Sequence, residues 1–194
     1  MFHKGLNKEL LIETAKDLID EYGYSNFSMR LLADKLGVKT ASLYTHIDSM
    51  NSLITEVGLL VLKEQKEYLM SYISGKHRGQ AVMALALAYR NFAKEHKELY
   101  RFIMQIPISS NDELKRAATM VTEPFMHVLI EYKFSNKQKM HWQRILRGTM
   151  HGFISQEEYG YFSHYPIDVE ESYKLAIQCL IEGLNHEEAI YNEQ

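Results

Sequence analysis

Apolar residues recur every three to four positions along most of this chain, and this helical spacing is the feature that most restricts its fold. In the first such stretch the apolar stripe runs through Leu11, Ala15 and Leu18. Runs in which apolar and polar residues alternate, as in a half-buried strand, are absent. Only three of the 194 residues are prolines, so few positions force a helix to end. We therefore predict an all-α protein of about nine helices and no strands.

Two glycines divide the N-terminal part of the chain into short helices. Gly23 is expected to end the first helix, and Gly37 is expected to end a second helix over about residues 28–36. A third helix then follows over about residues 39–46. Two short helices that are joined by a glycine turn and supported by a first helix form a helix-turn-helix unit.

The rest of the chain reads as a longer run of helices. We predict a helix-turn-helix domain over residues 1–48 and a second helical domain over residues 49–194. Pro107 is expected to end a short helix, and the segment from Ser109 to Asp112 is expected to cap the next one. Pro124 should kink that helix, because proline lacks a backbone donor.

The stretch GVKTASLYTHI, residues 37–47, carries small, uncharged, hydrogen-bonding side chains where a surface helix usually carries Glu and Lys. A helix that enters the major groove needs such short side chains, because the groove is only about 12 Å wide. Ser28 lies at a helix N-terminus, which favours phosphate, and Arg30 can make a bidentate contact to guanine. The predicted DNA contacts are Ser28, Arg30, Lys39, Thr40, Ala41, Ser42, Tyr44, Thr45 and His46.

Different side chains of this stretch suit different parts of the duplex. Thr40 and Thr45 can donate or accept hydrogen bonds at base edges, and the methyl group of Ala41 can contact a thymine methyl group. The hydroxyl of Tyr44 and the ring of His46 can reach phosphate oxygens, which fixes the register without reading the sequence. The stretch is therefore predicted to be a recognition helix.

Residues 27–54, FSMRLLADKLGVKTASLYTHIDSMNSLI, resemble the DNA-binding signature of TetR-family transcriptional regulators. The resemblance is spread over the Ser28-to-Ala33 helix, Leu36-Gly37-Val38, Leu43-Tyr44, His46 and Leu53-Ile54. It implies a homodimeric repressor whose N-terminal three-helix domains bind a palindromic operator in double-stranded DNA. It also implies a divergent C-terminal domain that binds a small effector, which releases the DNA.

The chain departs from the family pattern at three positions. Met50 stands where the family usually has a Lys that contacts phosphate, so one phosphate contact is expected to be missing. Ile47 replaces a usual aromatic residue, and Lys39 replaces a Ser or similar cap. Acidic residues also cluster on the first helix. The alternative function is therefore a helical, dimeric interaction protein whose degenerate helix-turn-helix has lost DNA binding.

The last two predicted helices have broad apolar faces. Leu175 and Ile181 lie beside the main apolar stripe of the final helix, so that helix is expected to need burial on more than one side. Pairing both helices with their copies from a second subunit gives an isologous four-helix interface. We predict a homodimer formed through these two helices, which is also where the family dimerises.

A ligand pocket is predicted among the middle helices. Met and aromatic side chains on several predicted helices are the candidates: Tyr89, Phe92, Phe102, Met104, Met120, Trp142, Met150 and His151. Their composition predicts a largely apolar or aromatic effector with a few polar anchors. For His151 a buried histidine of the core is the alternative. Trp142 followed by His151 and Gly152 also resembles the C-terminal domain type of this family that is named after a Trp-His-Gly pattern.

Other classes of protein find little support. The sequence has no glycine-rich phosphate loop and no Gly-x-Ser-x-Gly motif, so we do not expect an enzyme or a cofactor. His141 and His151 are too far apart on one helix to share a face, so no metal site is expected. The start of the chain carries charges inside its apolar stretch, and Cys179 is the sole cysteine. We expect no membrane span and a cytoplasmic protein.

Overall fold

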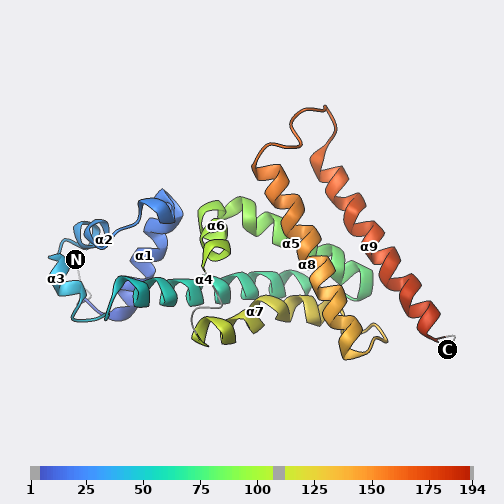
Figure 1. The fold of residues 1–194 in the computed structure, drawn as a ribbon, viewed down its shortest axis with the longest axis horizontal. Coiled ribbons are helices and arrows are strands. Elements are labelled where there is room, and N and C mark those ends of the chain that lie inside the picture. The colour runs from blue at the N-terminus through green and yellow to red at the C-terminus, as the bar shows by residue number, and fades with distance from the viewer. Residues whose placement is uncertain (1–4, 107–111, 193–194) are drawn as a thin grey trace. The chain divides into compact units, whose positions relative to one another are not determined.

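The computed structural model describes residues 5–106 and 112–192, and these residues are almost entirely helical (Figure 1). They form nine α-helices and one short 3-10 helix, and no strand occurs among them, which confirms the predicted all-α class. The elements are α1 (Lys8–Tyr22), η1 (Tyr24–Asn26), α2 (Met29–Leu36), α3 (Thr40–Leu43), α4 (Met50–Ile73), α5 (Arg78–Glu95), α6 (Lys97–Gln105), α7 (Asp112–Val128), α8 (Asn136–Glu158) and α9 (Val169–Asn192).

Two of the predicted helix boundaries lie outside the described residues, namely the end at Pro107 and the cap at Ser109. Pro124 lies inside α7. That helix ends at Val128, and Tyr132 lies in the turn that follows.

The helices form two compact units. The first contains residues 1–65 and 94–119, and the second contains residues 66–93 and 120–194. The first unit therefore combines the helix-turn-helix segment with α6 and the beginnings of α4 and α7. The domain boundary after residue 48 stays a prediction. Each compact unit combines two separate stretches of the chain, so the units do not test a single boundary along the sequence.

Capping groups define the short helices of the first unit. The side chain of Asn7 accepts a hydrogen bond from the backbone N–H of Leu10, and Ser28 caps α2 in the same way through Leu31. Gly37 is left-handed, with φ of 67°, and the backbone N–H of Val38 donates to the carbonyl of Ala33 at 3.0 Å. This Schellman motif ends α2 and fixes the turn into α3.

In the core of the first unit, α2 packs against both α1 and α3. Leu18, Leu32 and Leu43 are each almost fully buried there. Ala33 is buried as well, as expected of a small residue between closely packed helices. Tyr22 follows Leu18 at helical spacing, but it is 48% exposed. It is the last residue of α1, where the chain turns away at Gly23.

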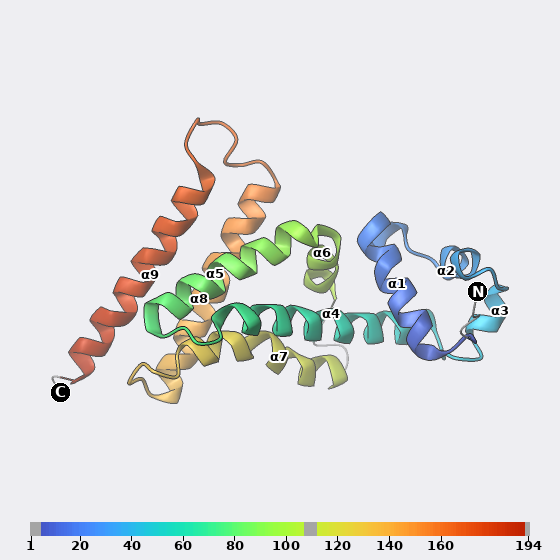
Figure 2. The same ribbon diagram turned by 180° about the vertical axis from the view of Figure 1, so that it is seen from behind.

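In the second unit, α8 and α9 lie next to each other and are joined by the loop over residues 159–168 (Figure 2). A full capping box starts α8, in which Ser135 and Gln138 exchange hydrogen bonds. The indole N–H of Trp142 donates to Glu187 at 2.7 Å, which ties the two helices together. A Cβ atom at Gly183 would lie 3.1 Å from Trp142, so the absence of a side chain there allows the close approach.

Candidate functional site

The predicted recognition helix is present but shorter than expected. Instead of residues 39–46, α3 covers only Thr40–Leu43, and a tighter turn continues it. In that turn the backbone N–H of His46 donates to the carbonyl of Leu43 at 3.0 Å. The hydroxyl of Thr45 donates to the carbonyl of Ser42 at 2.7 Å. The segment therefore keeps helical direction up to Ile47 although its last turn tightens.

One side of this segment faces solvent and the other is buried. Leu43 and Ile47 are buried, whereas Ala41, Tyr44 and Thr45 are exposed. Tyr44 exposes 49% of its surface although it is a large aromatic residue. Thr40, Ser42 and His46 are partly exposed. The short hydrogen-bonding side chains thus form one accessible surface, which is the property that contact with base edges requires.

The other predicted DNA contacts lie beside this surface. Ser28 is exposed at the N-terminus of α2, where its hydroxyl accepts a hydrogen bond from the N–H of Leu31 at 3.2 Å. Arg30 is almost fully exposed and makes only a long, 3.9 Å ion pair with Asp34. Lys39 is the N-cap residue of α3, and its side chain makes no capping hydrogen bond. All nine residues lie on α2 or α3, at the N-cap of one of these helices, or in the turn after α3. Their contact with DNA stays a prediction.

The basic side chains of α1 pair with acidic partners. Lys16 contacts Glu64 of α4 at 2.7 Å and Glu13 of its own helix at 3.2 Å, and Lys8 pairs with Glu56 of α4. Burial lowers the pKa of Lys16, but the hydrogen bonds to both carboxylates outweigh this and raise it. These cations stabilise the joint of α1 and α4, so they are not spare charges for phosphate.

The eight residues of the predicted effector pocket are divided between the two compact units. Phe102 and Met104 belong to the first compact unit, and the other six belong to the second. Several of the rings are packed against other rings: Phe102 lies 5.1 Å from Tyr24, and Tyr89 lies 5.8 Å from Phe125. Trp142 is stacked on Phe134. A pocket lined by these residues stays a prediction.

His151 is half-buried on α8. Burial lowers its pKa from the usual 6.5, and the positive charge of Arg147 acts in the same direction. The folded protein therefore favours a neutral imidazole at this position. This agrees with the alternative of a histidine that packs in the protein interior.

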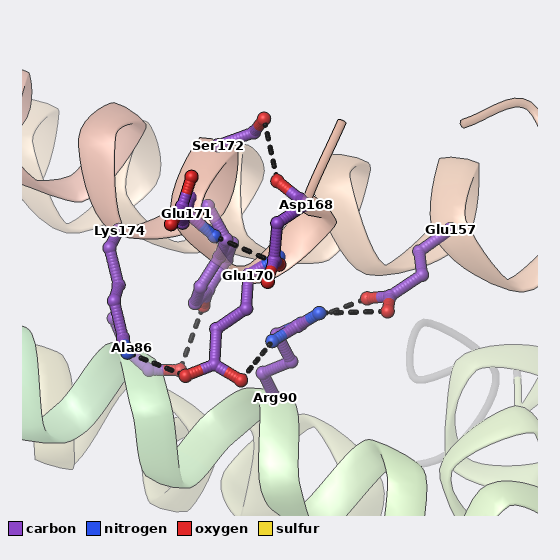
Figure 3. A network of polar contacts seen from close by, with 9 residues as sticks. Ala86, Arg90, Glu157, Asp168, Glu170, Glu171, Ser172 and Lys174 are labelled. Carbon is purple, nitrogen blue, oxygen red and sulfur yellow. Dashed lines mark hydrogen bonds and ion pairs between the residues drawn. The ribbon is translucent and has the colours of Figure 1, made fainter. Parts of the chain in front are cut away.

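A charge network around the buried Arg90 joins α5, α8 and α9, and the sequence analysis did not anticipate it (Figure 3). Arg90 of α5 is 5% exposed and donates two hydrogen bonds of 2.8 Å to the carboxylate of Glu157. Its guanidinium also lies 3.9 Å from Glu170 and above the ring of Tyr173. Tyr173 donates its hydroxyl to the carbonyl of Ala86 at 2.8 Å. The feature of the sequence that could have indicated this network is Arg90 itself, an arginine inside the apolar stripe of a predicted helix.

An open cavity of about 260 Å³ lies beside this network, where α8 ends and α9 begins. Its walls come mainly from aromatic residues of the loop between the two helices, including Tyr161, Phe162 and Tyr165. None of the residues predicted to form a pocket lines it. The signal that could have found it was the density of aromatic residues in the segment YGYFSHYP.

The short helices of the first unit, with the exposed surface of the recognition segment, form a helix-turn-helix of the kind found in DNA-binding proteins. A family model described as bacterial regulatory proteins of the tetR family matches residues 11–57. A second model, described as a tetracyclin repressor-like C-terminal domain, matches residues 82–180. The second match covers about half of the chain. The chain therefore belongs to the TetR family of transcriptional regulators.

Individual relatives agree with this assignment. The chain is 30% identical over 156 residues to the uncharacterised HTH-type transcriptional regulator Rv0681 of Mycobacterium tuberculosis, covering 80% of this chain and 72% of the relative. A protein of unknown function from Rhodococcus sp. RHA1 has a similar fold, with a TM-score of 0.80 at 20% identity over 94% of this chain and 97% of that one. A TetR variant from Acinetobacter baumannii AYE, solved in complex with minocycline, aligns with a TM-score of 0.68 at 17% identity over 95% and 99% of the two chains.

The matching families are regulators of transcription rather than enzymes. Among the residues that the structure describes, no helix is both long enough and apolar enough to cross a membrane.

Proposed function

We propose that this chain is a cytoplasmic repressor that binds a palindromic operator as a homodimer and leaves the DNA when a small, largely apolar effector binds. The observation that carries the proposal is the exposed surface of Ala41, Tyr44 and Thr45 on the recognition segment. The other side of this segment is buried in the core of the first unit, so the geometry of the segment is set before DNA binds. Thr and Ala side chains then read base edges while Tyr44 fixes the register on phosphate.

Two exposed apolar helix faces support the dimer. Leu175 of α9 is 65% exposed, and Ile145 of α8 and Ile190 of α9 are also exposed. On α8 a Cβ atom at Gly148 or Gly152 would meet nothing within 4 Å, so these faces are open to a second copy. A symmetric dimer presents two recognition helices about 34–36 Å apart, which is one turn of the duplex.

The C-terminal region matches a tetracyclin repressor-like family, which supports the proposal that this protein binds a small effector. The minocycline complex of the similar structure shows that a protein of this fold takes a small ligand. In our proposal the effector changes the spacing of the two recognition helices, and the coupling free energy is about 1–3 kcal/mol, as is typical of such switches.

The test is selection of tight-binding sequences from a random duplex library, followed by fluorescence anisotropy with the selected duplex. Tyr44→Ala should weaken binding about tenfold or more, because the dimer loses two contacts to phosphate of roughly 1 kcal/mol each. Tyr22→Ala is the matched control, since Tyr22 is an equally exposed tyrosine of the same unit that lies outside the recognition segment. Selection of no palindrome, or equal losses in both variants, would count against the proposal.

The second candidate is a dimeric interaction protein that no longer binds DNA. It is favoured by Met50 at the start of α4 and by the exposed acidic residues Glu9, Glu13 and Asp17 on α1. If the protein is a dimer but binds no duplex of the library even at low salt, this candidate is favoured over the repressor.

A further inference from the structure

The cavity between the end of α8 and the start of α9 has an aromatic lining that is only partly used in packing. Phe153 and Phe162 form its fixed part, with their ring centres 4.8 Å apart. Phe153 also rests against the buried ring of Tyr173 at 5.0 Å. By contrast, Tyr161 is 66% exposed and Tyr165 is 74% exposed, although both line the same cavity.

Two other tyrosines of the second unit, Tyr72 and Tyr159, are also exposed, but they do not line this cavity. Tyr161 and Tyr165 instead leave apolar ring surface in water around a hollow. A ligand that enters the hollow gains contact with rings that are already in place, so little of the binding free energy is lost in forming the site.

The size of the cavity limits what it can hold. An apolar cavity of about 150 Å³ in an engineered protein is large enough for benzene. At about 260 Å³ this cavity has room for one or two fused rings, but it is smaller than a pocket for a drug-sized molecule.

The charges around the cavity limit the ligand further. Its lining contains no Lys, Arg or His. Two cations on the helices beside the cavity, Arg90 and Lys174, are already paired with Glu157 and Glu170. The adjoining start of α9 adds Asp168 and Glu171, and the loop adds only the exposed His164, so a carboxylate ligand would meet mainly acidic groups. The one polar side chain of the lining besides the tyrosines is Ser172, whose hydroxyl donates to the carbonyl of Asp168.

We infer that this cavity is a binding site for a small, uncharged aromatic compound of one or two rings, held by Phe153, Phe162 and the two exposed tyrosines. The site is separate from the pocket that the sequence analysis predicted among the middle helices. Through Phe153 the ligand also reaches Tyr173, whose hydroxyl is bonded to Ala86 of α5. The binding of this ligand in the cavity does not depend on the proposed function. A role of the ligand as the effector that releases DNA does rest on the proposed function.

The test is a binding titration with indole as an uncharged two-ring probe and indole-3-carboxylate as its anionic counterpart, followed by ligand-observed NMR at neutral pH. Ser172→Phe and Val169→Phe each place a ring in the cavity, and either should weaken indole binding at least about tenfold because the space is filled. Glu171→Phe is the matched control, because Glu171 is exposed on the same turn and does not line the cavity. Circular dichroism and thermal unfolding show which variants are folded.

We expect saturable indole binding to the wild type and to Glu171→Phe, and at least about tenfold weaker binding of the carboxylate. Two results would overturn the inference. One is the absence of saturable indole binding to the wild type below about 1 mM, which corresponds to only about 4 kcal/mol. The other is equal binding by the wild type and a folded cavity-filling variant.

The same titration separates this inference from the proposed function. Suppose that the protein binds indole, loses this binding when the cavity is filled, and selects no duplex. This result would support the binding site and contradict the proposed repressor function. If indole binds but leaves operator binding unchanged, both the binding site and the repressor function are supported. This cavity is then not the effector site.

Discussion

Met50 is the residue whose replacement we expect to change DNA binding most. It is half-buried at the first residue of α4, and the TetR pattern usually places a phosphate-contacting Lys there. The net charge of the chain is −3, so any attraction to DNA has to come from local groups. The loss of one cation at this place therefore matters more than it would in a basic protein.

Restoring this charge should strengthen DNA binding. In Met50→Lys we expect tighter binding to the selected duplex, with a slope of log K against log salt that is steeper by about 1.8, because each subunit of the dimer adds one phosphate contact worth about 0.9. The measurement is anisotropy between about 50 and 200 mM salt. Met70→Lys is the control, since Met70 is also half-buried on α4 but lies about 30 Å further along that helix. An identical slope in wild type and Met50→Lys would show that α4 does not approach phosphate.

Arg90 is the residue whose environment makes the strongest stability prediction. Its guanidinium is buried and depends on Glu157 for two hydrogen bonds. In Glu157→Gln we expect the free energy of unfolding to fall by about 1–3 kcal/mol, because the buried cation loses its closest negative charge. The loss is smaller than for a fully buried pair because Glu157 is partly accessible to water.

Urea unfolding measures this loss. Asp34→Asn is the matched control, since it removes the partner of Arg30 from a pair that is exposed on both sides and 3.9 Å long. That change should alter the unfolding free energy by less than about 0.5 kcal/mol. If the two variants lost equal stability, burial would not be what makes the Arg90 pair important.

At the scale of elements, local signals placed most helices correctly. Gly37 ends α2 because the left-handed conformation there is easiest for glycine, and Ser28 caps the same helix with a side chain suited to that role. Such features act over four or five residues, so they can be identified in the sequence. The accessible surface of the recognition segment was predictable for the same reason, since Leu43 and Ile47 fix which side is buried.

Features that depend on which helices meet could not be predicted in this way. Tyr22 has the spacing of a core residue, but it lies at the end of α1 and remains exposed. Arg90 is stable inside the second unit only because α8 and α9 bring two carboxylates to it, from 67 and 80 residues further along the chain. The cavity beside them is formed by a loop whose conformation has no helical period, so no repeating pattern marks it.

At the scale of the whole molecule, two exposed helix faces remain to be explained. An isologous interface uses every contact twice, so one leucine contributes at two symmetric places. A buried leucine stabilises an assembly by about 1.5–3 kcal/mol relative to an exposed one. Leu175, which is 65% exposed on α9, is therefore a sensitive position for the proposed dimer.

We expect Leu175→Glu to weaken self-association at least about a hundredfold, because two leucine contacts are lost and two carboxylates are brought together. Sedimentation velocity over a range of micromolar concentrations would show this as a shift from dimer to monomer. Ile130→Glu is the matched control, since Ile130 is 67% exposed but lies in the turn after α7, outside α8 and α9. The Leu175 variant should also lose tight binding to a palindrome while keeping weak binding to a half-site, since each recognition surface is intact. A wild-type protein that stays monomeric, or a Leu175→Glu variant that stays dimeric, would show that these helix faces are not the interface.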